Sequence, residues 1–257
     1  MPAPTIAARL RAGETVYCAW ATTPEPLVAE TLARVGFDCV NLEMQHGFHD
    51  INSVLRGIGA VSLAGKAPVV RMGVGDNATA SRVLDMGAEG IIAPMINSVA
   101  DARALAAATR YPPVGERSWG PTRAMALQGI SDQQAQLTTA NSNTFVFAMI
   151  ETKQALAVVD DILAVEGIDG VFFGPSDLSV TLSDGRRIAP FSDDLDEPAR
   201  LVAARAEAAG KVAGAFCASA ERGRHFRKLG FRFIALAGDL VMLANGASDM
   251  LNAASGD

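Results

Sequence analysis

The sequence is poor in the features that typify secreted and membrane proteins. Its three cysteines, Cys18, Cys39 and Cys217, lie far apart in apolar runs, which favours buried reduced thiols over disulfides or a zinc cluster. No uncharged apolar run approaches the roughly 18 residues of a transmembrane helix, and residues 1–10 lack the basic and apolar regions of a signal peptide. We therefore expect a cytoplasmic protein that does not contact a membrane.

Basic residues are too few and too scattered to form a nucleic-acid-binding surface. The chain has 22 lysines and arginines against 28 acidic residues, and no basic block is longer than the two residues of Arg186-Arg187. Apolar residues are abundant, at 49%, and 24 of the 257 residues are glycine, as is typical of a compact globular protein. We expect a small-molecule partner, no nucleic acid and, because no linker divides the chain, one domain over residues 1–257.

Short apolar runs alternate with helical segments along the whole chain. The expected strands span residues 15–21, 38–44, 68–72, 90–95, 144–151, 170–174, 212–217 and 231–237. The expected helices span about 24–35, 51–63, 77–86, 99–109, 131–140, 153–164, 194–209, 219–229 and 239–253. Eight such units in this length predict a (β/α)₈ TIM barrel, since no glycine-rich phosphate turn follows Ala21 as a doubly wound sheet would require.

Two segments are expected to form loops. Residues 112–130 are rich in glycine and proline before Thr122 and show little periodicity, and loops of this length are usually functional. Residues 182–198 are polar and are expected to form a surface loop between the sixth strand and its helix.

Two expected strands end in a carboxylate. Glu151 closes the fifth strand, and Asp177 follows the sixth after Gly174-Pro175-Ser176. In a barrel the active site lies at the C-terminal ends of the strands, and two neighbouring anions repel each other unless a cation lies between them. Together the two residues favour a divalent metal site. The alternative is that each acid caps the helix that follows.

Other polar residues gather at the same ends of neighbouring strands. His46 and His49, two of only three histidines, follow the second strand, and His46 is either catalytic or a structural histidine. Arg71 ends the third strand, where its planar guanidinium could bind a carboxylate. The alternative for Arg71 is a buried ion pair with Glu43 or Asp85.

Several of these segments resemble the HpcH/HpaI family of class II, metal-dependent pyruvate aldolases, such as 4-hydroxy-2-oxoheptanedioate aldolase. The resemblance runs from about residue 15 to 240 and implies a barrel assembled as a homohexamer, a trimer of dimers, with the C-terminal helix packed on a neighbouring subunit. The matching segments are Asn41-Leu-Glu-Met-Gln-His46-Gly, Pro68-Val-Val-Arg71, Leu84-Asp85-Met-Gly-Ala-Glu-Gly-Ile-Ile-Ala-Pro94-Met, Arg110-Tyr-Pro-Pro-Val-Gly115-Glu-Arg117, Ile150-Glu151-Thr and Gly170-Val-Phe-Phe-Gly-Pro175-Ser-Asp177-Leu-Ser.

The resemblance also implies how a 2-oxo acid is bound. Glu151 and Asp177 would be ligands of Mg²⁺, Mn²⁺ or Co²⁺, and Arg71 would contact the keto oxygen and stabilise the enolate. The turn from Gly174 through Pro175 would present the backbone N–H groups of Ser176 and Asp177 to the pyruvate carboxylate.

On the aldehyde side, the resemblance implies that His46 is the catalytic base, with Asp85 as its dyad partner. The segment Gly115 to Gly120 and Arg123 resemble the family's loop near the distal end of the substrate. The sequence departs from the family at Met149, where several members have Gln, at Glu43, where Asp is commoner, and at Ala237-Gly238-Asp239, where others have Gly-Val-Asp.

The expected reaction is reversible cleavage of a 4-hydroxy-2-oxo acid into pyruvate, or a related 2-oxo acid, and an aldehyde. A metal would withdraw charge from the enolate and a histidine near neutral pKa would take the hydroxyl proton. A Schiff-base route is disfavoured because none of the four lysines lies inside an expected strand. Three alternatives remain: a citramalyl- or malyl-CoA lyase, a phosphosugar isomerase barrel, and a catalytically silent oligomeric barrel.

Overall fold

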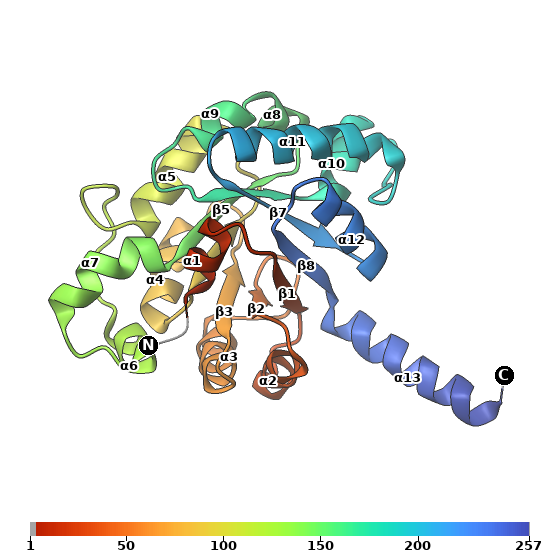
Figure 1. The fold of residues 1–257 in the computed structure, drawn as a ribbon, viewed down its shortest axis with the longest axis horizontal. Coiled ribbons are helices and arrows are strands. Elements are labelled where there is room, and N and C mark those ends of the chain that lie inside the picture. Colours follow the sequence, from red (N-terminus) through yellow and green to blue (C-terminus); the bar gives the residue numbers. More distant parts are fainter. Residues whose placement is uncertain (1–3, 257) are drawn as a thin grey trace.

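The computed structural model describes residues 4–256 and contains a closed barrel of eight parallel strands in the order of the sequence (Figure 1). The predicted (β/α)₈ barrel is confirmed. Each expected strand is present within two residues of its predicted bounds. The strands are β1 (Val16–Ala21), β2 (Cys39–Glu43), β3 (Ala67–Arg71), β4 (Gly90–Ala93), β5 (Phe145–Ile150), β6 (Gly170–Phe173), β7 (Val212–Cys217) and β8 (Phe233–Gly238).

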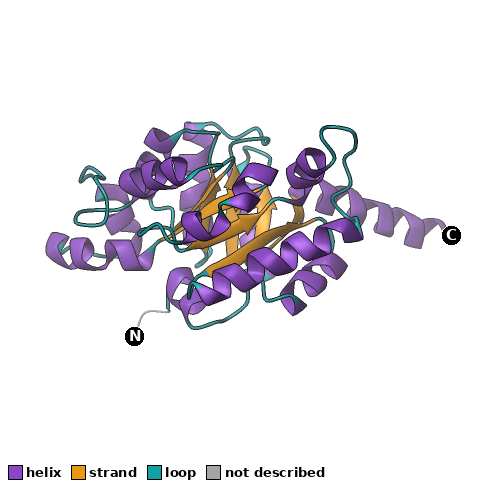
Figure 2. Ribbon diagram, turned by 90° about the horizontal axis from the view of Figure 1, so that it is seen from above, coloured by secondary structure: helices purple, strands orange, loops and turns teal. Residues whose placement is uncertain are grey.

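Helices surround the barrel, as the view from above in Figure 2 shows. Residues 51–63, 77–86 and 99–109 form helices with the predicted bounds. The helices are α1 (Ile6–Arg11), α2 (Pro26–Val35), α3 (Ile51–Leu63), α4 (Asn77–Met86), α5 (Val99–Thr109), α6 (Thr122–Gln128), α7 (Gln133–Asn143), α8 (Lys153–Ala157), α9 (Val159–Leu163), α10 (Pro175–Leu182), α11 (Asp196–Ala208), α12 (Ala220–Lys228) and α13 (Asp239–Ser255), with a 3₁₀ turn, η1, at Asp193–Leu195.

Alternate residues of each strand belong to two separate apolar clusters. On β5, Phe145, Phe147 and Met149 belong to the cluster inside the barrel, whereas Val146 and the other alternate residues pack against the helices. The two-residue period of a strand produces this division. Because of this alternation, every second side chain at the C-terminal end of a strand points into the mouth of the barrel, where the candidate site lies.

Helix α1 closes the opposite, N-terminal end of the barrel and was not predicted. Its residues Ile6, Ala7 and Leu10 are buried in the interior cluster with Phe145. The helix is only six residues long, with Thr5 as its N-cap, so its apolar pattern is too short to be recognised in the sequence.

Three further expectations about helices need correction. The segment 112–130 contains α6, which Gly129 ends in the left-handed conformation. The expected helix 153–164 is two short helices that meet at Val158. Helix α10 was not predicted, since residues 175–181 were assigned to no helix and Leu182 was assigned to a loop. The helix begins at Pro175, in a first-turn position that proline fills readily.

Helix α13 leaves the barrel and extends away from it (Figure 1). Its apolar side chains are exposed, and Asp239 is its only buried residue. The largest exposed apolar side chains are Leu240 47%, Val241 50%, Leu243 69%, Met250 77% and Leu251 68%. Among residues 4–256, no helix combines the length and the apolar character needed to cross a bilayer.

Candidate active site

Glu151 follows β5 directly and is buried at the mouth of the barrel, with 1% of its surface exposed. Its Oε1 accepts a hydrogen bond of 2.6 Å from the backbone N–H of Met95. Met95 adopts a left-handed conformation (φ 55°) just after β4, in a turn that presents this N–H. Burial, and after it the nearby charges of Asp177 and Glu43, raise the pKa of Glu151 to about 7.

The second carboxylate oxygen of Glu151, Oε2, is buried and has no hydrogen-bond partner among the described residues. It faces Gly174, where an added Cβ would lie 2.7 Å from it. A glycine is therefore needed to leave room beside this oxygen. A buried carboxylate oxygen without a donor is costly, and a cation placed beside it would offset that cost.

Asp177 lies in the first turn of α10, which begins immediately after β6. Its side chain is exposed, and its charge is close enough to contribute to the raised pKa of Glu151. Glu151 does not cap the following helix, because Thr152 does so by accepting a bond of 3.0 Å from Ala155. The capping alternative is therefore wrong for Glu151, while Asp177 does occupy a first-turn position.

Arg71 at the end of β3 is held by three different contacts. Its Nε donates to Glu43 Oε2 at 2.5 Å, its guanidinium lies 5.0 Å from the ring centre of Trp20, and its Nη1 is 4.0 Å from the sulfur of Met149. The ion pair that the sequence left open is therefore formed with Glu43. Thioether sulfur is a weak acceptor, so the outer edge of the guanidinium remains available to a ligand.

His46 lies in the loop between β2 and α3, and its side chain is exposed. Glu43 Oε1 accepts hydrogen bonds from the backbone N–H groups of Gln45 at 2.7 Å and His46 at 2.9 Å. One buried carboxylate thus positions both Arg71 and the start of the histidine loop. The role of His46 as a base stays a prediction.

Within the described part of the chain, Asp85 is paired with Arg117 at 2.6 Å rather than with His46. The Arg117 guanidinium also lies 4.5 Å from the ring centre of Tyr111. These contacts fix the loop that follows α5. Within the single chain Asp85 therefore pairs with Arg117 and not with His46, and the dyad implied by the family resemblance stays a prediction.

Arg123 lies on α6 and is exposed. Its Nη2 would be 2.9 Å from a Cβ at Gly59, so the guanidinium packs against α3. The structure does not bring it together with Glu151 or Arg71, and its contact with substrate stays a prediction.

Two residues at the barrel mouth had no assigned role. Asp239, at the start of α13, accepts bonds from the backbone N–H groups of Thr22 at 3.0 Å and Thr23 at 2.9 Å, which joins the end of β8 to the end of β1. His49 is buried, its Nδ1 lies 3.1 Å from Ser53 Oγ and its Nε2 has no partner among the described residues. Burial lowers the pKa of His49, and the nearby Asp239 opposes this shift. In the sequence, Asp239 is recognisable as an acid that ends the last expected strand. No feature of the sequence distinguishes the buried His49 from the exposed His46.

The donor set at the mouth suits a divalent cation. Glu151 and Asp177 supply carboxylate oxygens, which Mg²⁺ and Mn²⁺ prefer, and Glu151 Oε2 is buried without a donor. Among residues 4–256, no cluster of three or more His, Cys, Asp or Glu side chains could enclose a metal alone. Two protein ligands would leave the other coordination positions of a bound cation to water and substrate, as is usual for Mg²⁺ sites.

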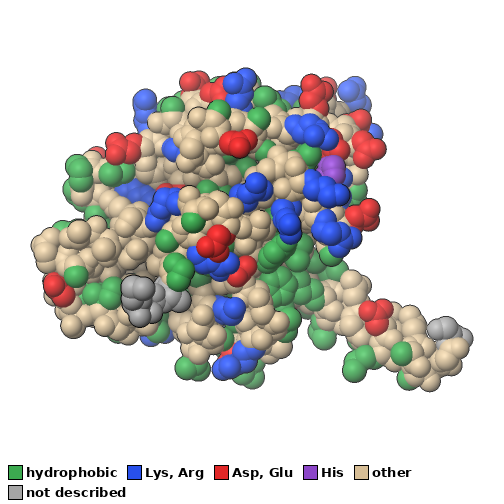
Figure 3. Space-filling model, viewed as in Figure 1, with side chains coloured by type: hydrophobic (Ala, Val, Ile, Leu, Met, Phe, Trp, Pro, Cys, Tyr) green, Lys and Arg blue, Asp and Glu red, His purple; other side chains and the backbone are tan. Residues whose placement is uncertain are grey.

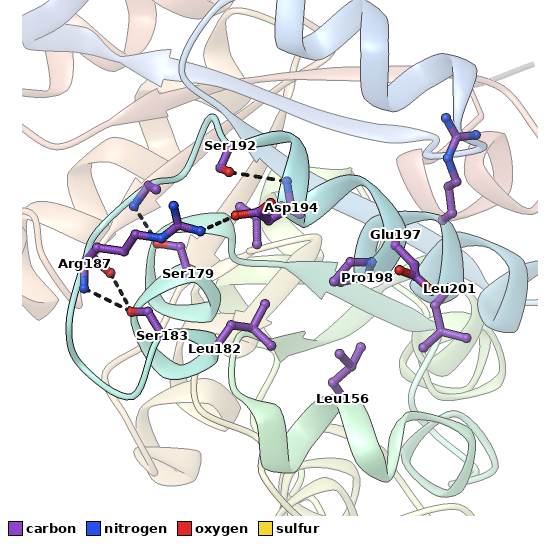
Figure 4. A pocket seen from close by; sticks show the side chains of 13 residues that line it. Leu156, Ser179, Leu182, Ser183, Arg187, Ser192, Asp194, Glu197, Pro198 and Leu201 are labelled. Atoms are coloured by element: carbon purple, nitrogen blue, oxygen red, sulfur yellow. Dashed lines mark hydrogen bonds and ion pairs between the residues drawn. The ribbon is translucent and has the colours of Figure 1, made fainter.

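A cavity of about 740 Å³ lies outside the barrel, between α8, α10 and α11. Figure 4 shows Leu156, Leu182 and Leu201 around it and Arg187 paired with Asp194. Its polar side chains bond mainly to one another and to backbone, as with Ser183 Oγ and the carbonyl of Arg187. It is separate from the carboxylates at the mouth.

The barrel and the polar groups at its mouth are typical of an enzyme site for a small molecule. The family model for HpcH/HpaI aldolase/citrate lyase matches residues 17–246, and the chain belongs to this family. The chain is similar to a hydroxypyruvate/pyruvate aldolase of Rhizorhabdus wittichii, with 41% identity over 93% of this chain and 94% of that protein. It is also 32% identical to a 2-keto-3-deoxy-L-rhamnonate aldolase of Shigella sonnei, over 95% of this chain and 90% of that protein.

Solved structures agree with this assignment. The crystal structure of an HpcH/HpaI aldolase from Desulfitobacterium hafniense superposes with a TM-score of 0.88 at 26% identity, covering 98% of this chain and 96% of that one. The chain is therefore an aldolase, a carbon–carbon lyase of the HpcH/HpaI class.

Proposed function

We propose that this aldolase reversibly cleaves 4-hydroxy-2-oxo acids between C3 and C4, giving pyruvate or a related 2-oxo acid and an aldehyde, with Mg²⁺, Mn²⁺ or Co²⁺ held by Glu151 and Asp177. The observation on which this rests is the buried Glu151 Oε2, which has no donor among residues 4–256 and faces Gly174 at the barrel mouth. A divalent cation held there would supply positive charge to the oxygens of the 2-oxo acid.

Backbone and side-chain groups of the protein would orient the 2-oxo acid. The backbone N–H groups of Ser176 and Asp177, in the first turn of the eight-residue helix α10, would bind the substrate carboxylate. Arg71 would donate to the keto oxygen, where negative charge develops as the C3–C4 bond breaks. The Glu43 contact at 2.5 Å and the Trp20 ring keep its guanidinium in place before substrate arrives.

His46 would remove the proton from the 4-hydroxyl group, which allows the aldehyde to form. Its exposed side chain is at the mouth and its backbone is fixed by Glu43. Within the single chain Asp85 is paired with Arg117, so as the proposed dyad partner it would act on His46 after a rearrangement of that pair or across a contact between subunits. Arg123 would reach the distal end of a substrate only through a comparable change or an adjoining subunit.

We further propose that the protein is a homo-oligomer, a hexamer built as a trimer of dimers, and that it acts in the cytoplasm. Helix α13 exposes Leu243, Met250 and Leu251, and Figure 3 shows an apolar patch on the barrel wall beside the start of this helix. Apolar surface of this kind marks an interface. Packing of α13 on a neighbouring subunit would cover both surfaces.

A lactate dehydrogenase-coupled assay tests the proposed reaction. Purified protein is incubated with a series of 4-hydroxy-2-oxo acids, with and without EDTA, and pyruvate release is recorded. We expect release that EDTA abolishes and Mg²⁺, Mn²⁺ or Co²⁺ restores. Full activity in EDTA would exclude the metal, and cleavage of citramalyl- or malyl-CoA alone would favour the acyl-CoA lyase alternative.

A further inference from the structure

A cavity of about 560 Å³ lies at the closed, N-terminal end of the barrel, opposite the candidate active site. Its walls come from α1, from α11 and from the residues around the starts of β5, β6, β7 and β8. Figure 1 shows α1 in front of the barrel, and Figure 3, drawn from the same side, shows Lys and Arg side chains on this face. Sites for small molecules commonly have volumes of roughly 300–1,000 Å³, so the cavity has room for a small organic ligand.

The inner wall of this cavity is apolar. It is formed by Leu10 of α1, by Phe145 and Phe147 of β5 and by Val212 of β7, all of which belong to or pack against the cluster that fills the barrel. The ring centres of the two phenylalanines lie 4.9 Å apart. An apolar group of a ligand would be removed from water against these side chains, which favours binding.

Three cationic side chains line the same cavity, and they come from three different segments: Arg11, Lys211 and Arg232. A backbone carbonyl holds each of them, as the carbonyl of Val165 does by accepting a bond of 2.9 Å from Lys211 Nζ. In the part of the chain that the structure describes, none of the three forms an ion pair. The carbonyls fix the positions of these groups but leave their positive charge without a counter-ion.

The two acidic side chains of the cavity do not neutralise these cations. Asp169 is paired with the buried Arg110 and accepts a bond of 2.7 Å from the backbone N–H of Val146. Glu207 is exposed on α11. Burial lowers the pKa of Lys211, and the nearby Asp169 opposes this shift. An anion bound beside Lys211 would favour its charged form further.

We propose that this cavity is a second binding site of the enzyme, for a monocarboxylate with an apolar body, such as an arylalkanoate. The carboxylate would accept hydrogen bonds from Lys211 and from the planar forks of Arg11 or Arg232, which suit its shape. The apolar part would lie against Phe145 and Phe147. The proposal does not depend on the reaction proposed above, because the site lies at the other end of the barrel.

Isothermal titration calorimetry with 4-phenylbutanoate as the probe tests this site. The full-length protein is titrated with a divalent metal and excess pyruvate present, so that the barrel mouth is occupied, and the neutral isostere 4-phenylbutanamide is titrated in parallel. We expect one binding site for the acid in each chain. The amide should bind at least about tenfold more weakly, because it cannot form the charged hydrogen bonds.

Variants of the cations locate the bound probe. Lys211→Met and Arg232→Met should each weaken binding of the acid about tenfold, as expected for loss of a charged hydrogen bond. The control is Lys228→Met, which removes an exposed cation of α12 that does not line the cavity and should bind the acid like the parent. Lys211→Gln keeps a donor for the carbonyl of Val165 and replaces Lys211→Met if that variant does not fold.

Three results would overturn the proposal: no binding of the acid by the parent protein, equal binding of the acid and the amide, or unchanged binding of the acid in the Lys211 and Arg232 variants. Binding of the acid that Arg71→Ala abolishes would place the probe at the barrel mouth and would overturn it as well.

Discussion

Arg71 and Glu43 lie on adjacent strands and are joined by a hydrogen bond of 2.5 Å, with only 1% of the Glu43 side chain and 11% of the Arg71 side chain exposed. The same carboxylate binds the backbone N–H groups of Gln45 and His46. Glu43 therefore positions Arg71, the proposed donor to the enolate, and the loop that carries the proposed base. The position of Arg71 and the position of the His46 loop both depend on the Glu43 side chain.

Replacing Glu43 with alanine should destabilise the protein by about 3–5 kcal/mol, because it leaves the Arg71 charge buried without its partner. Urea unfolding monitored by circular dichroism measures the change. The control is Glu30→Ala, which removes an exposed pair with Arg34 and should cost less than about 1 kcal/mol. Equal effects of the two substitutions would show that the Glu43 pair has no special importance.

The two halves of the reaction should separate in variants of His46 and Arg71. His46→Ala should reduce carbon–carbon cleavage by about 10²- to 10⁴-fold and leave metal-dependent exchange of the pyruvate methyl protons much less affected. Arg71→Ala should depress both rates, by an amount equivalent to about 2.7–4 kcal/mol. Deuterium uptake followed by NMR, beside a cleavage assay, provides the two rates. Cleavage at the parental rate in His46→Ala would rule out this base.

Glu89 should make stability depend on pH. Burial raises its pKa to about 7, an effect that the N–H of Ile6 partly opposes. Because the folded-state pKa exceeds the unfolded value of 4.5, the folded protein binds more protons between these values, and stability decreases as the pH rises from about 4.5 through 7.

The neutral variant Glu89→Gln should therefore be more stable than the parent at pH 8, by about 2 kcal/mol after allowance for relaxation, and the difference should shrink at pH 5. Urea unfolding at both pH values measures it, with the exposed Glu207→Gln as a control. A parent protein that is equally or more stable than Glu89→Gln at pH 8 would contradict this assignment.

Helix α13 should hold the oligomer together. Leu243→Glu places a charge at a position that is 69% exposed in the single chain but would be buried in the assembly, so it should shift the protein towards smaller species. Asn245→Glu, on the same helix, is the control and should not. Light scattering measures the mass, and a monomeric parent protein would disprove the assembly.

The barrel was predictable because its strands are buried on both faces and therefore read as short apolar runs bounded by glycine, proline or acids. Segments without that signal were missed. Helix α1 is too short to show a period, and α10 begins inside the turn Gly174-Pro175, which reads as a break in structure. The helix expected at 153–164 is interrupted at Val158, where no glycine or proline marks the break.

The candidate site was predictable to the extent that strand ends meet in space. Glu151, Asp177 and Arg71 could be assigned to one edge of the barrel from order alone. The partners of these side chains could not be assigned from the sequence. Whether Arg71 pairs with Glu43 or with Asp85 depends on the register between neighbouring strands and on the face of the sheet from which each side chain projects. The pairing of Asp85 with Arg117 joins residues 32 positions apart in a segment without periodicity, and no sequence pattern indicated it.

The most direct test of the metal site is the exchange of pyruvate methyl protons for deuterium in the parent protein and in Glu151→Gln, with Mn²⁺ binding measured by electron paramagnetic resonance on the same samples. The parent should bind Mn²⁺ and exchange protons only when metal is present. Glu151→Gln should fold normally and lose both properties, because it lacks one of the two carboxylate ligands. Metal-dependent exchange at the parental rate in Glu151→Gln would contradict the account.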